Sequence, residues 1–521
     1  MAIASVDAGA PRSDEAVTDT EVLIVGAGFS GLGAAMALIE DGHSDFVVIE
    51  RAESLGGTWR DNSYPGCACD IPSVLYSYSE EQNPDWTRAF APQGEILDYM
   101  HAVAARHRLE PYIRYGHELL AADYDEDRQL WAVRTSAGEF TARFLISAVG
   151  ALADPVIPRL NGLERFRGRT FHSAGWDHDH DLSGRRVAVV GTGASAIQFV
   201  PEIVERVDRL TVFQRTPPWV LPRGNPEIPP AWRRAFRRRP RLERLARQAL
   251  FSLFESFHFG FRHPAAGRLA QRRALANIEH NVADPALRAK LTPDYALGCK
   301  RVLGSDTWYP SLCRPNVEVV TDRIATVTED GIVDAAGVHH EVDTIIFGTG
   351  FRVTDPPIAD RVRGRGGLTL GDSWQGSMKA HLGIAINGFP NMVMLLGPNT
   401  GLGHNSVLLM IEAQLGYLRK LLRYRTSRGL ATVEPTPEAQ GRFVADVDRR
   451  TDGSVWTAGG CVSWYLDATG RNSTLWPDSV RAYRRRLARF DEVDWRGDPA
   501  RPIPPAAVPA PASASASARR P

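Results

Sequence analysis

The stretch EVLIVGAGFSGLGAAMALIE, residues 21–40, decides the architecture of this chain. A short apolar run ends in glycines and a segment rich in Ala, Leu and Met follows, which predicts a buried strand, a tight turn and a helix. The stretch RRVAVVGTGASAIQFVPEIV, residues 185–204, repeats that order. Each is followed by a further apolar run, FVVIE at 46–50 and LTVFQR at 210–215. Strand–helix–strand alternation predicts an α/β protein with two Rossmann-like dinucleotide-binding domains built on parallel sheets.

The first glycine loop carries the pattern GxGxxG, formed by Gly26, Gly28 and Gly31. The first glycine permits the tight turn, the second lets the backbone approach a pyrophosphate, and the third lets the helix pack close to the strand. The positive end of the helix then faces the phosphates. Glu50 ends the next strand, where a carboxylate accepts hydrogen bonds from ribose hydroxyls. This loop therefore predicts a dinucleotide with an unphosphorylated ribose, as in FAD.

The segment ESLGGTWR follows Glu50 closely and fits a flavin site. Gly57 would let the backbone approach the flavin, while Thr58 and Trp59 supply a hydroxyl and an aromatic face.

The second loop carries the pattern GxGxxA, and its strand is followed by Arg215 and Thr216 in place of an acid. An acid would repel a 2′-phosphate, whereas Arg215 would attract one, which favours NADP(H) at this site. A surface arginine with a local partner is the alternative interpretation of Arg215. Two nucleotide sites in one chain imply hydride transfer from NADPH to a flavin. The loop residues expected to contact the nucleotide are Gly191, Thr192, Gly193, Ala194, Ser195 and Gln198.

The chain has 521 residues, more than a single core accommodates, and two or three domains are expected. Its ends are polar or rich in Pro, Ala and Ser, which predicts disorder there. The expected divisions are a disordered segment 1–19, the first part of an FAD domain at 20–150, an NADP domain at 151–344 with a mainly helical insertion at about 225–300, the second part of the FAD domain at 345–495, and a disordered tail 496–521.

The bulk composition excludes several classes of protein. The formal net charge is zero, which gives no reason to expect a nucleic-acid partner, and no apolar run is long enough for a membrane span. The cysteines match neither a disulfide framework nor a metal site, so reduced thiols, no metal and a cytoplasmic location are expected. They are Cys67, Cys69, Cys299, Cys313 and Cys461.

Residues 231–290 are rich in arginine and predict helices. A nucleic-acid or membrane surface is one interpretation of these arginines. A solvated helical face is favoured instead, because Glu243 and Glu255 interrupt the basic run and the chain has no general basic excess.

The segment FRGRTFHSAGWD, just before the second glycine loop, makes the prediction more specific. Its residues Phe166, Gly168, His172, Trp176 and Asp177 resemble, without a mismatch, the fingerprint of Baeyer–Villiger monooxygenases, the type I class B flavoprotein monooxygenases. The sister family that oxidises nitrogen and sulfur has an aromatic and a basic residue in place of Trp–Asp. The similarity extends from about residue 20 to 490. It includes the stretches YPGCACD, GCKR, IIFGTGF, GPNTGLGHNS and VSWYLDATGRNSTLWP.

The resemblance implies a reaction and a set of residues for it. NADPH reduces FAD, O2 adds to give a C4a-peroxyflavin, and one oxygen atom is inserted next to a ketone carbonyl to give an ester or lactone. Arg301 would stabilise the anionic species and Asp70 would orient that arginine. Lys300 would assist near the 2′-phosphate, and Trp464 would lie on a loop that closes over NADP and substrate. Many relatives have an arginine where this chain has Ala68.

Three alternatives stay open at this point. An N- or S-oxygenating flavin monooxygenase would need the same cofactors. A flavin disulfide reductase would need a CxxC or CxxxxC pair, which the sequence does not contain. A nucleotide-sensing protein without activity is the third. The sequence indicates neither the ketone nor the oligomeric state.

Overall fold

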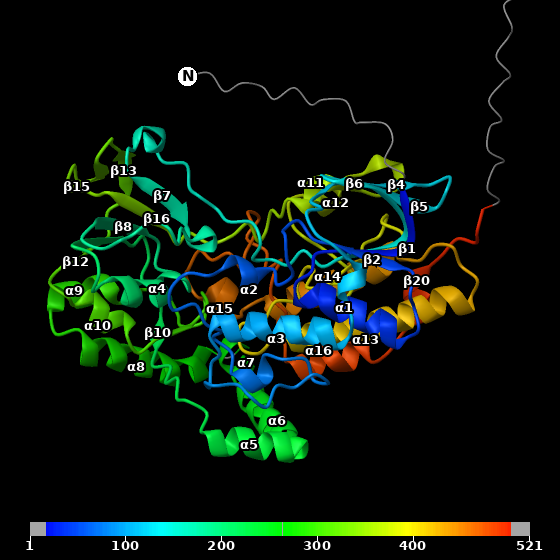
Figure 1. Ribbon diagram of the computed structural model, residues 1–521, viewed down its shortest axis with the longest axis horizontal. Coiled ribbons are helices and arrows are strands. Elements are labelled where there is room, and N and C mark those ends of the chain that lie inside the picture. The colour runs from blue at the N-terminus through cyan, green and yellow to red at the C-terminus, as the bar shows by residue number, and fades with distance from the viewer. Residues whose placement is uncertain (1–16, 263, 502–521) are drawn as a thin grey trace, which may run out of the picture.

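The computed structural model describes residues 17–262 and 264–501 and consists of two lobes side by side (Figure 1). The first lobe is built on the sheet that contains β1 (Thr18–Val25), and the second lobe on the sheet that contains β8 (Arg186–Val190). Of the segments expected to be disordered, 1–19 and 496–521, residues 1–16 and 502–521 lie outside the described residues. Thr18 and Asp19 instead belong to a strand, because they pair with Phe140 and Thr141.

The sheet of the first lobe has eight strands in the order β17-β4-β5-β6-β1-β2-β3, with β18 paired to β6. β1, β2, β3 and β6 run parallel, and β5 is antiparallel to both β4 and β6. The strands are β1 (Thr18–Val25), β2 (Phe46–Ile49), β3 (Ile113–Arg114), β4 (Leu119–Asp125), β5 (Leu130–Thr135), β6 (Gly138–Ser147), β17 (Val362–Arg363) and β18 (Met392–Met394).

Helices cover this sheet because β1 and β2 are apolar on both faces. Leu23, Ile24 and Val48 have no exposed surface. Helix α1 packs against α13, and α13 against α16. The helices of this lobe are α1 (Phe29–Glu40), α2 (Thr58–Asp61), α3 (Gln93–Arg106), α11 (Ile358–Arg361), α12 (Leu370–Trp374), α13 (Leu408–Ser427), α14 (Pro437–Thr451), α15 (Val455–Ala458) and α16 (Val480–Leu487).

The sheet of the second lobe is parallel throughout, in the order β12-β9-β8-β16-β7. Its strand β16 begins at the expected domain boundary, residue 344, and continues to 347, since an apolar strand does not indicate which sheet it joins. The strands are β7 (Arg169–His172), β8 (Arg186–Val190), β9 (Arg209–Phe213), β12 (Val317–Val320) and β16 (Thr344–Phe347). Helices α4 (Ala196–Ile203) and α10 (Trp308–Leu312) pack on each other beside it.

Between β9 and β12 the chain forms the expected helical insertion, and the predicted fold class is confirmed. Helices α5 and α6 project from the body of the molecule (Figure 1). No helix in the described ranges is both long and apolar enough to cross a membrane. The insertion contains α5 (Pro230–Arg238), α6 (Pro240–Ser256), α7 (His258–Arg262), α8 (Pro264–Asn281) and α9 (Pro285–Leu291).

Short strands complete the fold. They are β10 (Val220–Leu221) with β11 (Leu303–Gly304), the antiparallel set β13 (Ile324–Val327), β14 (Gly331–Asp334) and β15 (His339–Glu341), and β19 (Glu434–Pro435) with β20 (Trp495–Arg496).

The chain passes between the lobes twice, and the two crossing segments pair with each other. Pro155 and Phe351 form an antiparallel bridge. The Val156 amide donates to the Gly350 carbonyl over 2.9 Å, and the Arg352 amide donates to the Asp154 carbonyl over the same distance. The lobes are therefore connected by a short hydrogen-bonded ribbon.

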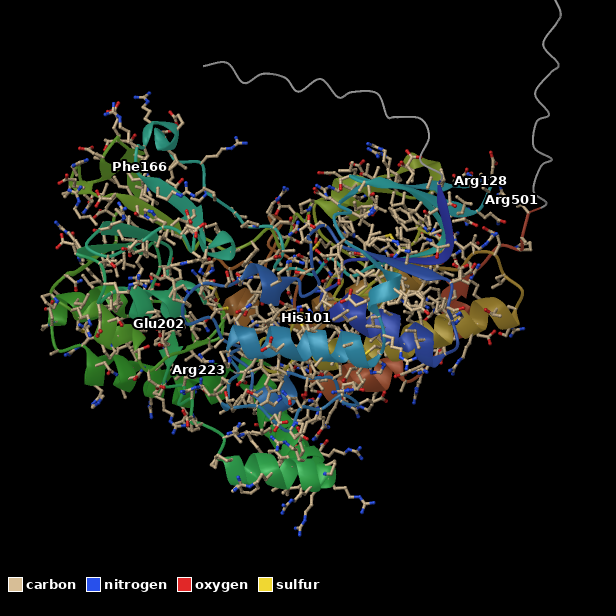
Figure 2. The ribbon with its side chains drawn as sticks, viewed as in Figure 1. His101, Arg128, Phe166, Glu202, Arg223 and Arg501 are labelled. Carbon is tan, nitrogen blue, oxygen red and sulfur yellow. A yellow bond between two sulfur atoms is a disulfide. The ribbon has the colours of Figure 1, made fainter. Side chains whose placement is uncertain are left out.

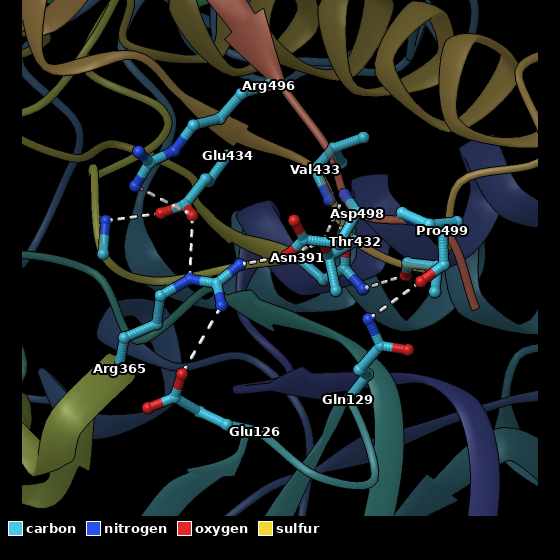
Figure 3. Close-up of polar contacts among 12 residues, drawn as sticks. Glu126, Gln129, Arg365, Asn391, Thr432, Val433, Glu434, Arg496, Asp498 and Pro499 are labelled. Carbon is cyan, nitrogen blue, oxygen red and sulfur yellow. Dashed lines mark hydrogen bonds and ion pairs between the residues drawn. The ribbon is translucent and has the colours of Figure 1, made fainter. Parts of the chain in front are cut away.

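An arginine-centred network attaches the C-terminal segment to the first lobe (Figure 3). Arg365 donates to Glu434 over 2.9 Å and to Asp498 over 2.6 Å. The Glu434 side chain is only 2% exposed and also pairs with Arg496 at 3.1 Å. The Arg501 amide donates to Gln129 over 2.8 Å. Residues 496–501, expected to begin a disordered tail, are therefore attached to the lobe by contacts distant in sequence.

Replacing Arg365 should destabilise the protein, because it leaves the buried Glu434 carboxylate with a single, half-exposed cationic partner. We expect Arg365→Ala to cost about 2–3 kcal/mol and to lower the Tm by several degrees in a calorimetric scan. Arg363 is a suitable control, since its pair with Asp123 is exposed and 3.4 Å long. Equal Tm values for the Arg365→Ala and Arg363→Ala proteins would contradict this account.

Candidate functional site

A cavity of about 1160 Å³ lies between the lobes and receives residues from both. All the cofactor-contacting residues predicted from the sequence line it, except Gly31. These lining residues are Gly26, Gly28, Glu50, Gly57, Thr58, Trp59, Asp70, Gly191, Thr192, Gly193, Ala194, Ser195, Gln198, Arg215, Thr216, Lys300, Arg301 and Trp464. The two glycine loops, far apart in sequence, thus face one shared space.

The first loop has no room for side chains at two of its glycines. Gly26 has φ +106°, and a Cβ there would lie 2.7 Å from the Ala148 carbonyl oxygen. A Cβ on Gly31 would lie 1.8 Å from the Gly26 carbonyl oxygen, so Gly31 brings α1 against the turn from behind the cavity. A Cβ placed on Gly28 would have the Cα of Gly57 as its nearest neighbour, at 3.9 Å. The backbone at Gly28 and Gly57 is therefore open to a ligand.

Glu50 lies at the end of β2, beside the loop. One carboxylate oxygen accepts from the Ala27 amide over 2.8 Å. The other accepts from the Ala52 amide and from Arg60, both over 3.1 Å. A carboxylate can accept further hydrogen bonds on its free lone pairs, so Glu50 can still receive ribose hydroxyls.

The second loop repeats the steric arrangement of the first. Gly191 has φ +103°, and a Cβ there would lie 2.6 Å from the Gly348 carbonyl oxygen. Arg215 is exposed at the end of β9, and Lys300 lies over the Tyr295 ring at 5.1 Å. Burial is the main cause that lowers the pKa of Lys300, and the charge of Arg215 adds to it. The charge of Asp294 opposes this shift. Within residues 17–262 and 264–501 neither cation is in an ion pair, which is the arrangement that suits a phosphate.

Arg301 and Asp70 meet across the cavity from different lobes. Arg301 Nε and Nη2 lie 2.7 and 2.6 Å from Asp70 Oδ2, and the side chains are 27% and 37% exposed. The pKa of the Arg301 guanidinium lies above its ordinary value, and the main cause is the negative charge of Asp70. Tyr465 is adjacent, and burial, opposed by Arg301, raises its pKa to about 12. The site therefore contains a fixed, oriented positive charge.

A second arginine, outside the cavity lining, binds the backbone next to Asp70. Arg223 (Figure 2) donates to the Cys69 carbonyl oxygen and lies over the Phe90 ring at 4.7 Å. Burial lowers the pKa of this guanidinium and the nearby Asp70 opposes that effect. Arg223 follows Pro222 in a loop with no recognisable pattern, so no signal in the sequence indicates it.

Gln198, expected to bind cofactor, also joins the lobes. Its Oε1 accepts from the Tyr64 hydroxyl over 2.9 Å, and its Nε2 donates to the Ala68 carbonyl over 3.0 Å. Gln198 belongs to α4 of the second lobe, while Tyr64 and Ala68 belong to the first. The amide therefore connects the two lobes beside the cavity.

The five fingerprint residues lie in the second lobe outside the cavity lining, with Phe166 near its far end (Figure 2). His172 Nδ1 accepts from the Ala174 amide over 3.0 Å, and burial lowers the pKa of its imidazole. Asp177 pairs with Arg169 at 2.5 Å. These contacts suit a positioning role rather than contact with a reacting group.

Packing explains two further fingerprint positions. Trp176 packs against Phe199 of α4, the helix that follows the second glycine loop, with ring centroids 5.2 Å apart and ring planes tilted by 55°. A Cβ on Gly168 would lie 2.2 Å from the Asp343 carbonyl oxygen, so no other residue fits there.

The reduced-thiol interpretation is wrong for two cysteines. Cys299 and Cys461 form a disulfide between segments 162 residues apart. No local pattern reveals such a pair, because only the tertiary fold brings the two segments together. Cys67 and Cys69 are free and buried, and burial raises the pKa of Cys67 to about 11 and that of Cys69 higher. These two thiols stay protonated and do not form a redox pair.

The disulfide adjoins the predicted site. Cys299 directly precedes Lys300 and Arg301, and Cys461 lies on the segment that leads to Trp464. The Trp464 side chain is 43% exposed at the cavity and stands edge-on to Tyr465, with ring centroids 4.5 Å apart. It is therefore not a core tryptophan.

The residues of the cavity fit two dinucleotides. The open backbone at Gly28 and Gly57 suits a flavin nucleotide beside Glu50, and the unpaired cations Arg215 and Lys300 suit a phosphorylated ribose. Two such loops facing one space define the class of flavoproteins that take electrons from a nicotinamide.

Comparisons with known proteins give the family. Residues 19–252 match the flavin-binding monooxygenase-like family. A Baeyer–Villiger monooxygenase of Streptomyces coelicolor is 48% identical, over 91% of this chain and 92% of its own. One from Pseudomonas aeruginosa is 47% identical over 90% of each. The structure of cyclohexanone monooxygenase from Rhodococcus sp. Phi1 bound to NADP+ has a TM-score of 0.84 at 29% identity, covering 93% of this chain and 100% of that one.

The chain belongs to the Baeyer–Villiger monooxygenases. The resemblance drawn from the fingerprint segment is thereby confirmed.

Removing the cation at the second loop should weaken the binding of NADPH more than the binding of NADH. We expect Arg215→Ala to raise the KM for NADPH roughly 10- to 100-fold, the value of a lost charge-assisted hydrogen bond, with little change for NADH. Steady-state coenzyme oxidation measures both constants. Arg206, exposed on the same lobe and absent from the cavity lining, provides the control variant. An equal rise for both coenzymes would show that Arg215 does not contact the 2′-phosphate.

Proposed function

We propose that this protein uses NADPH and O2 to insert one oxygen atom next to a ketone carbonyl, giving an ester or lactone, NADP+ and water. FAD and NADP(H) are its cofactors in this proposal. Bound flavin, once reduced, supplies the activation of O2 that no side chain can provide.

The Arg301–Asp70 pair is the observation that carries the proposal. Oxygen transfer to a carbonyl develops negative charge on oxygen, and a preorganised cation beside it stabilises that charge. Arginine suits this task because it stays protonated at every working pH and so does not quench an anion by giving up a proton. Asp70 keeps the guanidinium in one orientation. Arg223 donates to the carbonyl oxygen of Cys69, the residue before Asp70, and so holds the segment that carries Asp70.

The other residues bind and orient. The first glycine loop and Glu50 hold the FAD pyrophosphate and ribose, while Gly57, Thr58 and Trp59 lie toward the flavin. The second loop holds the NADP pyrophosphate, and Arg215, Thr216 and Lys300 hold the 2′-phosphate. Trp464 covers the cavity and helps exclude water from the reacting groups.

A cytoplasmic location also belongs to the proposal. The free thiols of Cys67, Cys69 and Cys313 support it. The Cys299–Cys461 disulfide counts against it, because disulfides are uncommon in reducing compartments.

Product analysis tests the reaction directly. The purified protein is incubated with NADPH, 18O2 and a panel of aliphatic, cyclic, aryl and steroid-like ketones. We expect an ester or lactone that contains a single 18O atom from at least one ketone. NADPH consumption that yields only hydrogen peroxide across the panel, or oxidation of amines and sulfides without any ester, would overturn the proposal.

The Arg301→Ala protein should still accept electrons but fail to oxygenate. Flavin reduction by NADPH, followed anaerobically by absorbance, should proceed, while ester formation should fall by about 10²–10³-fold or more. Arg301→Lys keeps the charge but not the two-nitrogen contact with Asp70, so it should recover part of the loss. Arg128→Ala, far from the cavity, is the control (Figure 2). Ester formation at the unmodified rate in Arg301→Ala would rule out the assigned role.

A further inference from the structure

Helices α5 and α6 present a strongly basic surface on an otherwise neutral protein. They form the projection at one edge of the molecule, and side chains with nitrogen tips extend outward from α5 (Figure 2). Besides Arg237, the exposed arginines of this pair are Arg234, Arg238, Arg239, Arg241 and Arg244. Within the described ranges none of these five is in an ion pair, whereas Arg237 pairs with Asp85 at 2.5 Å. The chain as a whole has a formal net charge of zero.

The two acids of α6 do not interrupt this surface. Glu243 is 4% exposed and Glu255 is 5% exposed. Burial raises the pKa of Glu243 to about 7, while Glu255 accepts from the Arg481 amide over 2.8 Å inside the protein. Contrary to the expectation from the sequence, these acids do not interrupt the basic surface, since both carboxylates are buried.

Large apolar side chains of these two helices are at least half exposed, although Trp232 and Phe257 each also contact a nearby ring, Phe236 and Phe254. Leu245 and Leu253 of α6 and Phe257, directly after it, are 66%, 52% and 50% exposed, and their spacing places them within about a third of the helix circumference. Trp232 of α5 is 52% exposed. The inward side of α6 is separately occupied by Arg247 and Phe251, both buried. The helix thus has a core face and a second, outward apolar stripe.

We propose that the α5–α6 surface docks on an anionic lipid bilayer. Arginine next to exposed tryptophan, leucine and phenylalanine is the composition of helices that lie in the membrane interface, where the rings and aliphatic groups enter the headgroup region. Unpaired arginines add attraction to anionic headgroups.

Charge decides between the possible partners. A second copy of the chain would bring the same five unpaired arginines face to face across a symmetric contact, which is unfavourable. A nucleic acid would use the arginines but leave the stripe of Leu245, Leu253 and Phe257 in water. A bilayer with anionic lipids engages both.

Vesicle co-sedimentation of the full chain, loaded with FAD, tests the proposal. Vesicles of equal parts phosphatidylcholine and phosphatidylglycerol are compared with vesicles of phosphatidylcholine alone, at low and at physiological ionic strength. We expect binding to the anionic vesicles, weakened by salt, and little binding to the neutral ones.

Two pairs of variants separate the contributions. Arg238→Gln/Arg241→Gln should lower the partition coefficient on the order of 25-fold, about fivefold for each arginine. Its control, Arg128→Gln/Arg159→Gln, removes the same charge from exposed positions elsewhere and should leave the coefficient unchanged. Leu245→Ser/Leu253→Ser should lower it on the order of tenfold. The control for that pair is Val338→Ser/Val493→Ser, at positions 51% and 83% exposed.

All four proteins should reduce flavin with NADPH at the unmodified rate, because none of these residues lines the cavity. They should also keep the unmodified Tm, because all the substituted positions are exposed. Absence of binding to anionic vesicles at low salt, equal binding to neutral vesicles, or equal losses in test and control variants would overturn the proposal. So would binding to duplex DNA that the arginine variant loses and the leucine variant keeps, which would indicate a nucleic-acid surface. Because these readouts need no ketone, they are independent of the proposed reaction.

Discussion

Both lobes depend on a close approach of backbone to backbone at the turn after the first strand. A Cβ on Gly31 would stand 1.8 Å from the Gly26 carbonyl, and Cβ atoms on Gly26 and Gly191 would stand 2.7 and 2.6 Å from carbonyls of neighbouring strands. Those neighbours are Ala148 after β6 and Gly348 after β16. The glycines therefore determine where the helix, the central strand and the adjacent strand meet, and they leave the strand ends open toward the cavity.

Each turn is fixed within its own lobe. The two nucleotide loops therefore face the same cavity only because contacts between the lobes hold the lobes together. Gln198 with Tyr64, Arg223 with the Cys69 carbonyl, and Arg301 with Asp70 all join residues of different lobes. The charged pair at the centre of the proposed chemistry thus forms only when the lobes meet. In the proposed reaction, nucleotide binding, electron transfer and oxygen transfer all require the two lobes to be in contact.

Much of this could be predicted from the sequence, because the signals are local. The glycine spacing and the flanking apolar runs predict both sheets, and the helical insertion follows from its composition. The cavity residues of both loops are predictable for the same reason. What could not be predicted depends on contacts between distant segments. β16 gives no indication of its sheet, Arg223 has no pattern around it, and Cys299 and Cys461 are 162 residues apart. The inward orientation of Glu243 and Glu255 is likewise visible only in the packed helix.

The disulfide has a consequence for how the lobes can move. On one side they are joined by the crossing ribbon at Pro155 and Phe351. On the other side Cys299 of the second lobe is bonded to Cys461 of the first, with their Cα atoms 6.1 Å apart. These covalent connections at two separate places add to the hydrogen bonds and the ion pair between the lobes, so the disulfide restrains their relative movement more than the ribbon alone would. The disulfide therefore holds the segment of Cys299 beside the segment of Cys461, and Lys300 and Arg301, which directly follow Cys299, are restrained with it.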